Sequence, residues 1–598
     1  MYSEYDLHSV PLSFVPTRQR VERFLSSCGL RLDPVDSYAV VTRLGDDTIL
    51  AGGGLAGNVI KCVAVSDALR GTGMMQRLLS HLLSQAHAAG HTCVRVFTKP
   101  DNREIFESLG FRLLAQAPQA IFMENGLPGI DGYLQQIKSA AVAKAPADTA
   151  GVIVMNANPF TLGHQALVQW AAQQVQSLYV IAVREDCSTF SYAERLHMIR
   201  EGCRPLGNVT VLEGSDYAIS AVTFPTYFLK RLDEAADTQI TLDLDLFARH
   251  IAPALGASRR FVGSEPTDAL TARYVELMQQ QLPPRGIEVR VMPRLTDGEA
   301  PVSASRVRRH LDENHLYPAA QLVPATTLPE LLGHLAHQAL QQELDTTPKP
   351  GLVDRQDSGA HHDMTYATMQ QGLDALTPFF DEVAEISNHN ELPDSAQLLS
   401  LGQRGEAEML HATQGVNTHR GALFALGLID AAAAHTLHQH GHITASDLQH
   451  DIMSLAGTMS QTSGTHGSEA VCRHHVNGAM AMAQSGYRQL FGDWLPYYRA
   501  LAGDPWQRHK TLLHIIAQLD DTNVIHRVGY DRAQQVKAEA QALLDHFTPA
   551  ALEDLNRRYI AENISPGGAA DMLALTIFAD ALVENNEQDL TDKANRAN

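Results

Sequence analysis

The spacing of apolar residues changes once along the chain, near residue 325, and this change limits the possible folds most. Before it, short β-branched runs alternate with helical stretches such as 74–89, which predicts α/β domains. From Leu328 onward Ala, Leu, Gln and His predominate, and apolar residues recur every three to four positions, as in 422–437. That spacing predicts an all-α domain. The expected strands are 39–42, 60–65, 93–97, 152–155, 179–183, 261–263 and 288–292.

A length of 598 residues favours two to four domains. Two stretches predict linkers: 137–150, which contains Ala, Lys and Pro, and 322–329, which contains two prolines and a Thr pair. We therefore expect three domains, at residues 1–136, 150–322 and 328–598. The first two are expected to be α/β and the third all-α.

Charge and cysteine content exclude several classes of protein. The chain has 46 Lys and Arg against 67 Asp and Glu, a formal net charge of −21. Nucleic acid is therefore a poor partner, and any phosphate site must be local. Six cysteines at irregular spacing, without a C-x-x-C, predict neither a zinc site nor a disulfide framework. Without a signal-like N-terminus or an apolar run near 18 residues, we expect a cytoplasmic protein with no membrane partner.

A glycine-containing turn stands between an expected strand and an expected helix at Arg70-Gly71-Thr-Gly73. Small residues at a helix start let backbone N–H groups approach a pyrophosphate, although such a turn can also merely end a strand. With residues 102–111, which end in Leu-Gly-Phe, this turn resembles the acyl-CoA loop of the GCN5-related N-acetyltransferase family. The resemblance implies an acetyltransferase-like fold with Arg70, Gly71 and Gly73 at CoA. Met75 stands where that family has its last loop glycine.

A second turn follows the buried strand expected at 152–155, and it carries Thr161-Leu-Gly163-His164. The carboxyl end of a first strand is where doubly wound sheets bind nucleotides. Gly163 would let a base or ribose pack on the backbone, and His164 could donate to phosphate oxygens in an α-phosphoryl transition state. Asn158 and Thr161 belong to the same expected ATP site. Two further candidates for lining it are Arg195 and the turn at 263–266.

Near the end of the same region stands Ser303-Ala-Ser305-Arg306-Val-Arg308, an expected helix start. Free N–H groups and guanidinium forks there can hold a triphosphate, while the alternative role of Ser303 is that of an N-cap. Together the two motifs resemble the nucleotidyltransferase superfamily, whose T/H-x-G-H and S-x-S-x-x-R elements flank ATP. The resemblance implies a Rossmann-like fold for this domain, with these residues at the nucleotide.

A more specific resemblance covers residues 1 to about 320. Residues 155–164, Thr98-Lys-Pro and 302–308 together resemble the citrate lyase acetyl ligase family. The resemblance implies ATP-dependent, AMP-forming acetylation, from acetate, of the prosthetic-group thiol on the citrate lyase acyl carrier protein. Our hypothesis is that the central domain makes acetyl adenylate while the N-terminal domain seats the pantetheine arm.

Four polar clusters interrupt the helical pattern of the C-terminal part, at 347–363, 415–421, 520–527 and 563–571. Any one could be a surface loop. They include Thr-Pro-Lys-Pro-Gly-Leu-Val-Asp-Arg, Gly-Val-Asn-Thr-His-Arg-Gly, Asp-Thr-Asn and Ser-Pro-Gly-Gly-Ala-Ala-Asp, which resemble the triphosphoribosyl-dephospho-CoA synthase family across residues 330–598. The implied reaction joins ATP to 3′-dephospho-CoA and releases adenine. Its oxocarbenium-like ribose needs nearby carboxylates.

The resemblance suggests hypothetical roles for the charged and polar residues of these clusters. Side chains that would hold the triphosphate are Lys349, Arg355, Asn523 and Arg527. Carboxylates that would bind Mg²⁺ or activate the 2′-hydroxyl are Asp354, Asp363 and Asp521. His361 or His419 would protonate the leaving adenine, since histidine is the side chain best suited to proton transfer near neutral pH.

One stretch departs from the family pattern. After 464–467 the resemblance implies Arg-Gly-Glu leading to Gly-Phe, whereas this chain has Val-Asn-Gly-Ala at 476–479 and Gly486-Tyr487. Histidines between 435 and 442 allow a metal site, although they lie at an expected helix end.

We therefore predict a bifunctional maturation enzyme of citrate lyase that uses ATP as substrate with Mg²⁺ as activator, without a permanently bound cofactor. One alternative is a general nucleotidyltransferase fused to an unrelated transferase. The other is a C-terminal part that only docks the lyase or its carrier protein.

Overall fold

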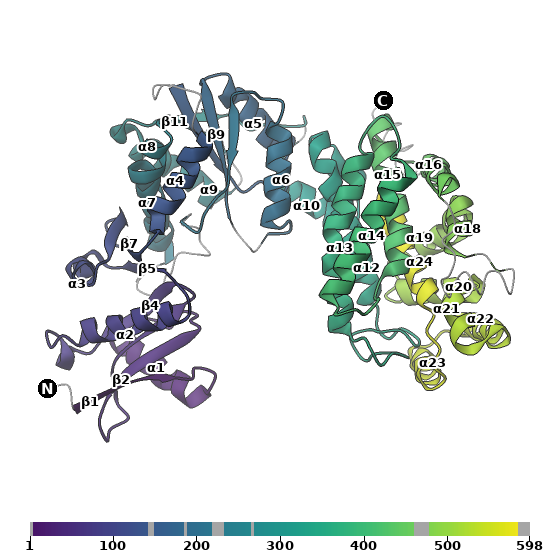
Figure 1. Cartoon of the computed structure of the whole chain (residues 1–598), viewed down its shortest axis with the longest axis horizontal. Helices are drawn as coiled ribbons and strands as arrows, with labels where there is room; N and C mark the ends of the chain where they lie inside the picture. The colour runs from purple at the N-terminus through teal and green to yellow at the C-terminus, as the bar shows by residue number, and fades with distance from the viewer. Residues whose placement is uncertain are drawn as a thin grey trace. The chain divides into compact units, whose positions relative to one another are not determined.

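The computed structural model describes residues 4–141, 149–184, 188–217, 232–264, 268–298, 300–459, 476 and 478–583 (Figure 1). The chain divides into two compact units. The α/β unit comprises Met1–Asn158 and Leu162–Val302, and the helical unit comprises Pro159–Thr161 and Ser303–Asn598. The expected change from α/β to all-α is confirmed.

The first sheet of the α/β unit has seven strands in the order β1-β2-β3-β4-β5-β7-β6. Strands β1 to β4 are antiparallel, whereas β4 and β5 run parallel and pair at only two positions, Val59 with Arg95 and Ile60 with Val96. This mixed sheet with helices is the acetyltransferase-like fold expected for the N-terminal region. Its elements are β1 (Tyr5–Val10), α1 (Val15–Ser27), β2 (Ser37–Arg43), β3 (Ile49–Ala56), β4 (Val59–Val65), α2 (Met74–Ala88), β5 (Cys93–Thr98), α3 (Arg103–Ser108), β6 (Arg112–Gln116), β7 (Ile121–Gly126) and α4 (Gly129–Ala141).

Strand β3 was not among the expected strands because three consecutive glycines have low strand propensity. The glycines are required by packing. A Cβ on Gly52 would lie 2.8 Å from the Tyr38 ring, and one on Gly54 would lie 2.8 Å from the Ser37 carbonyl. Tertiary contacts therefore override propensity at this strand.

The second sheet is fully parallel, in the order β10-β9-β8-β11-β12, so the strand order reverses at β8. That order is the doubly wound arrangement, in which ligands bind at the carboxyl ends of the strands beside the reversal point. The expected Rossmann-like fold is confirmed. Its elements are β8 (Ala150–Met155), α5 (Leu162–Ala172), β9 (Ser177–Ala182), α6 (Tyr192–Cys203), β10 (Val209–Leu212), α7 (Leu232–Leu246), α8 (Ala252–Ala254), β11 (Ala257–Gly263), α9 (Ala269–Gln281) and β12 (Glu288–Met292).

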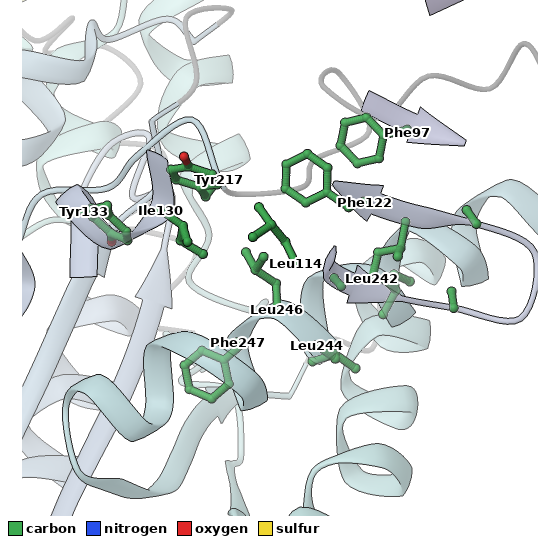
Figure 2. Close-up of a cluster of buried hydrophobic side chains, with 14 of the residues drawn as sticks. Phe97, Leu114, Phe122, Ile130, Tyr133, Tyr217, Leu242, Leu244, Leu246 and Phe247 are labelled. Carbon is green, nitrogen blue, oxygen red and sulfur yellow. The ribbon is translucent and has the colours of Figure 1, made fainter. Parts of the chain in front are cut away.

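The two sheets share one hydrophobic core. Phe122 of the first sheet stacks on Phe97 and also contacts the Tyr217 ring, and the α7 residue Leu242 belongs to the same cluster (Figure 2). Tyr217 donates a 2.6 Å hydrogen bond to Glu124, a fully buried carboxylate of β7. The linker predicted at 137–150 is therefore wrong at its start, because 137–141 continue α4 and Ile137 is buried. Residues 142–148 lie outside the described residues.

The helical unit packs two largely buried helices, α15 and α24, among the others (Figure 1). By length and apolar content α15 could span a membrane, but 78% of the relevant window is buried within the unit, as in a core helix. The helices of this unit are α10 (Ala304–Asp312), α11 (Leu316–Ala320), α12 (Leu328–Leu344), α13 (Tyr366–Ser387), α14 (Ser395–Ala412), α15 (Arg420–His440), α16 (Ala445–Thr458), α18 (Ala479–Gln484), η8 (Leu490–Trp494), α19 (Leu495–Ala500), α20 (Gln507–Gln518), α21 (Thr522–Val528), α22 (Tyr530–Asp545), α23 (Pro549–Ala561) and α24 (Gly567–Leu582).

The second predicted linker, 322–329, is not a linker in the structure. Leu322, Val323 and Thr327 are buried, and the Thr327 hydroxyl donates a 3.0 Å hydrogen bond to the Phe160 carbonyl. Its prolines begin helical turns, because Pro329 lies in the first turn of α12, where proline needs no N–H partner. The three-domain boundaries themselves remain a prediction.

Candidate functional site

The carboxyl edge of the second sheet carries the first group of candidate residues. His164 is the third residue of α5, the helix that follows β8. Burial and, to a smaller extent, the charge of Arg294 together lower the pKa of His164 to about 4. The imidazole is therefore neutral near pH 7 and can act there as a neutral hydrogen-bond donor. Arg294 was missed from the sequence, where the signal is a cation two residues beyond the end of β12.

Arg195 supports the loops at this edge. The side chain is fully buried and donates to the carbonyls of Asn156 at 3.0 Å, Val183 at 2.8 Å and Phe190 at 3.2 Å. These carbonyls belong to the segments that follow β8 and β9 and to the segment before α6. Arg195 therefore holds the edge together. Asn158 acts similarly, because its side-chain oxygen accepts a 3.1 Å hydrogen bond from the Phe190 N–H.

We expect Arg195→Met to unfold the α/β unit more easily, because one buried and two part-buried carbonyls lose a hydrogen bond, and each unsatisfied buried group costs about 1–3 kcal/mol. Thermal unfolding followed by circular dichroism measures the effect. The matched control is Arg200→Met, which breaks only an ion pair with Glu213 in which both side chains are about half exposed. Equal melting temperatures for the two variants would contradict this role.

The two nucleotide motifs are divided between the units. Gly163 and His164 belong to the α/β unit, whereas buried Thr161 and the residues from Ser303 onward belong to the helical unit. Ser303 is the N-cap of α10, as the alternative role predicts, and its hydroxyl accepts from the Arg306 N–H at 3.3 Å. Residues that follow on the same helix are Ser305, Arg306 and Arg308. The turn at 263–266 ends outside the described residues.

The glycine-containing turn before α2 has the backbone that its sequence requires. Gly71 and Gly73 have φ angles of 73° and 78°, a region that glycine adopts without strain, and Gly73 is the N-cap of α2. Arg70 is exposed and pairs with Asp67 at 3.0 Å. The turn thus presents a solvent-accessible guanidinium close to the start of α2.

In the helical unit the third and fourth clusters meet at Asp521. This buried carboxylate accepts from the N–H of Asn523 at 2.8 Å and from the N–H of Ala569 at 3.0 Å, so it joins the starts of α21 and α24. The Asn523 amide packs on the backbone of Gly567, where a Cβ would lie 2.9 Å from its nitrogen. Burial raises the pKa of Asp521, while these N–H groups lower it.

His361 of the first cluster contacts residues of the third and fourth clusters. Its Nε2 is 2.8 Å from the Ser565 hydroxyl of the fourth cluster, and its Nδ1 is 3.2 Å from the Arg527 guanidinium of the third. Arg527 also donates to the Ala360 carbonyl at 2.9 Å and to the Asn563 side chain at 2.9 Å. Burial and the charge of Arg527 lower the pKa of His361. Three clusters far apart in the sequence therefore meet at one point.

The remaining charged residues of the first cluster are placed differently. Lys349 is 1% exposed and forms a 2.5 Å ion pair with buried Glu343 of α12. Asp354 is also buried and closes a turn, because it accepts from the N–H groups of Lys349 at 2.8 Å and Gln356 at 2.7 Å. Arg355 is exposed and pairs with Asp345 at 2.7 Å.

The second cluster approaches the fourth at Gly421. A Cβ on Gly421 would lie 2.0 Å from an oxygen of Asp571, so the carboxyl group occupies the space that a side chain would need. His419 is 3% exposed and its Nδ1 is 2.9 Å from the Thr418 hydroxyl. Burial lowers the pKa of His419 to about 3, and the charge of Lys349 acts in the same direction.

The structure therefore brings the four clusters together but does not gather the predicted carboxylates into a metal site. Asp354 and Asp521 accept backbone N–H groups, and Asp363 is exposed, 3.8 Å from His361. Among the described residues, no group of three or more His, Cys, Asp or Glu side chains could hold a metal ion.

Two other features of the sequence have a structural outcome. His435 pairs with Asp451 at 2.7 Å and His438 lies 3.2 Å from the Asn388 side chain, so both have partners within the fold. Of the stretch that departs from the family pattern, 464–475 and Asn477 lie outside the described residues. Two further residues were not among the predicted site residues: Glu343, which pairs with Lys349, and Asp571, which packs on Gly421. The signal for Glu343 is an acidic residue on the apolar face of α12.

Comparisons with known proteins match each half separately. The family model "Citrate lyase ligase C-terminal domain" matches residues 150–331, and "ATP:dephospho-CoA triphosphoribosyl transferase" matches residues 329–589. The [Citrate [pro-3S]-lyase] ligase of Haemophilus influenzae is 40% identical over 314 residues, which are 52% of this chain and 93% of that protein.

Two further relatives match the C-terminal half. The probable 2-(5''-triphosphoribosyl)-3'-dephosphocoenzyme-A synthase of Pseudomonas savastanoi is 38% identical over 278 residues, which are 44% of this chain and 96% of that protein. A solved structure of a putative triphosphoribosyl-dephospho-CoA synthase from Archaeoglobus fulgidus is 15% identical, covers 36% of this chain and 97% of that one, and has a TM-score of 0.25. The chain belongs to two families joined end to end, with a [citrate [pro-3S]-lyase] ligase in its N-terminal half and a triphosphoribosyl-dephospho-CoA synthase in its C-terminal half.

Proposed function

We propose that the helical unit makes 2′-(5″-triphosphoribosyl)-3′-dephospho-CoA and that the N-terminal half later acetylates the thiol derived from it on citrate lyase. The observation that carries the proposal is the meeting of His361, Arg527 and Ser565, which come from three of the four family motifs. A random set of surface loops would not converge in this way. The chain thus acts as a bifunctional enzyme of citrate lyase maturation.

For the N-terminal half the proposed reaction uses ATP and acetate and forms AMP, with the citrate lyase acyl carrier protein as acceptor. The carboxyl edge at β8, with His164 and Arg294, would bind the phosphates. A neutral His164 would stabilise the transition state by donating a hydrogen bond, since charge develops on the α-phosphoryl oxygens. The exposed turn at Arg70, Gly71 and Gly73 would receive the pantetheine arm.

For the helical unit the proposed substrates are ATP and 3′-dephospho-CoA, with Mg²⁺ as activator and no permanently bound cofactor. Arg527 and the exposed Arg355 are the cations best placed for the triphosphate. Lys349 would act through its ion pair with Glu343. Exposed Asp363 is the carboxylate most accessible to a Mg²⁺-triphosphate complex.

We also place the protein in the cytoplasm. The described cysteines, Cys28, Cys62, Cys93 and Cys203, are all free thiols. Free thiols at these sites fit a reducing compartment, which is where acetate, ATP and dephospho-CoA are available together.

Chromatography of the reaction products tests the proposal. The full chain is incubated with ATP, Mg²⁺ and 3′-dephospho-CoA, and free adenine is scored against AMP. We expect adenine only when dephospho-CoA is present, and AMP only when acetate and the thiol form of the carrier protein are present. No adenine would favour a C-terminal half that only docks the lyase, and AMP-forming transfer to another acceptor would favour a general nucleotidyltransferase.

We expect Arg70→Ala to raise the KM for the carrier protein roughly tenfold, because one phosphate contact is worth about 1.5–3 kcal/mol at most and this one is exposed. Acetate-dependent exchange of pyrophosphate into ATP should not change, since adenylate forms elsewhere. The control is Arg18→Ala on α1, another exposed arginine. Unchanged thioester formation in Arg70→Ala would remove this turn from the acceptor site.

A further inference from the structure

Asn556 lies in α23, outside the four polar clusters, and is 4% exposed. Its side-chain oxygen accepts a 2.8 Å hydrogen bond from the buried N–H of Gly351, and its side-chain nitrogen donates a 3.3 Å hydrogen bond to the Asp357 carboxylate. Both partners belong to residues 349–360 of the first cluster, which we call the first-cluster loop. One amide group of α23 therefore holds two separate points of this loop.

The same two points are also tied within the first-cluster loop. The Asp357 carboxylate accepts a 2.8 Å hydrogen bond from the Gly359 N–H, and the Gly351 carbonyl accepts a 3.0 Å hydrogen bond from the Ala360 N–H. These bonds close the loop on itself, so its backbone moves as one piece. The contact with Asn556 then decides where that piece lies relative to α23.

The fourth cluster packs on the same glycine. Gly351 has a φ angle of 71°, and a Cβ there would lie 2.0 Å from the Ile564 carbonyl oxygen. Ile564 follows α23 closely in the chain and belongs to the fourth cluster. Asn556 therefore sets the position of the first-cluster loop relative to the fourth cluster.

Side chains proposed to meet the substrates depend on the position of this loop. Arg355 lies within it, and its side chain is 57% exposed. His361 follows it directly and lies 2.8 Å from the Ser565 hydroxyl, while the Ala360 carbonyl accepts a 2.9 Å hydrogen bond from Arg527. A displaced loop would therefore move Arg355 and break the meeting of the first cluster with the third and fourth.

We propose that Asn556 is a positioning residue for adenine release, which acts by holding the first-cluster loop against the fourth cluster. The proposal rests on the proposed function of the helical unit. Asn556 is buried and acts through Arg355 and His361, so it need not touch a substrate itself. A shift of about 1 Å in a site group, caused by a change elsewhere, can cost on the order of 100-fold in rate.

The chemistry of the two partners explains why an amide is needed. The Gly351 N–H requires an acceptor, and the Asp357 carboxylate requires a donor; an asparagine side chain supplies one of each. Asn556→Asp keeps the size of the side chain and the acceptor, but it places a second carboxylate beside Asp357. Adding Asp357→Asn restores a donor to the pair and still leaves an oxygen for the Gly359 N–H.

The test measures adenine release from ATP and 3′-dephospho-CoA by the full chain. We expect Asn556→Asp to lower kcat about 100-fold and to raise the KM for ATP roughly tenfold, because Arg355 is displaced with the loop. The double variant Asn556→Asp with Asp357→Asn should recover most of both losses. The control is Asp554→Asn on the same helix, a 59% exposed carboxylate that pairs with Arg557, and it should keep wild-type values.

A merely structural role would give a different pattern. A variant that only lost folded protein would lose kcat in proportion to its folded fraction, measured by circular dichroism, and would keep the wild-type KM. Hydrogen exchange of the peptide 347–363 reports on the loop directly. It should be faster in Asn556→Asp, return toward wild type in the double variant and stay unchanged in Asp554→Asn.

Several results would overturn the proposal: wild-type kcat and KM in Asn556→Asp, a loss of kcat that only follows the folded fraction, or a double variant no better than the single one. Adenine release by wild type keeps these outcomes apart from a failure of the proposed function. If wild type itself releases no adenine, the proposed function of the helical unit fails and the role of Asn556 fails with it.

Discussion

Replacement of Lys349 by Met should lower the free energy of unfolding of the helical unit by about 3–5 kcal/mol, the usual cost of removing one partner of a buried ion pair. Lys349 and Glu343 are 1% and 5% exposed at their side chains. Without Lys349, Glu343 would be an unpaired buried carboxylate close to Asp571. Denaturant unfolding of the full chain, followed by the helical circular dichroism signal, measures the loss.

The double variant Glu343→Gln with Lys349→Met is the matched control. Since it removes both charges, we expect it to regain most of the lost stability. It also separates two roles of Lys349. A stable double variant that binds ATP as wild type does would exclude Lys349 as a triphosphate ligand, and equal instability of the single and double variants would contradict the ion-pair argument.

Gly421→Ala should reduce adenine release about 100-fold, because displacing a site group by 1 Å can cost that much. The new Cβ would lie 2.0 Å from the Asp571 carboxyl oxygen, so either Asp571 or the first turn of α15 must move. Overpacking of this kind also costs about 1–3 kcal/mol of stability. Adenine release and thermal unfolding, measured on the same preparation, give both effects.

Gly402→Ala is the control for the glycine replacement. Gly402 lies in α14, where an added Cβ would meet only a Leu423 methyl group, at 3.8 Å. Alanine is the better helix former, so this variant should be as stable as wild type or more so. If Gly421→Ala and Gly402→Ala release adenine at the same rate, the reaction tolerates displacement of Asp571. Asp571 would then not belong to the site.

Much of the fold could be predicted from the sequence because it depends on local periodicity. The expected strands lie within β2, β4, β5, β8, β9, β11 and β12, apart from Val183 just beyond β9. The prediction did not include β1, β3, β6, β7 and β10. Strand β3 was missed since its glycines are explained only by Tyr38 and Ser37 across the sheet. The proline-rich stretch 322–329 was misinterpreted because proline is common both in linkers and in the first turn of a helix.

The candidate site was predictable as a set of motifs but not as an arrangement. The motifs include Lys349, Asp354 and Asp521, and nothing in their order along the chain shows which face a substrate. In the structure Lys349 forms an ion pair with Glu343, and Asp354 and Asp521 accept hydrogen bonds from backbone N–H groups. Such partners lie in other elements or depend on the path of a turn, so the sequence alone could not separate residues that support the site from those that reach solvent.

The shared core of the two sheets limits how this protein can be divided. Glu124 of β7 accepts from Tyr217, and Asp245 of α7 accepts a 2.7 Å hydrogen bond from the Gln116 N–H of β6. A truncation between the sheets would expose the stacked rings of Phe97 and Phe122 and remove one hydrogen bond from each of the two buried carboxylates. Gene fission or domain shuffling at that point would yield two aggregating halves. We therefore expect the two sheets to fold as one unit.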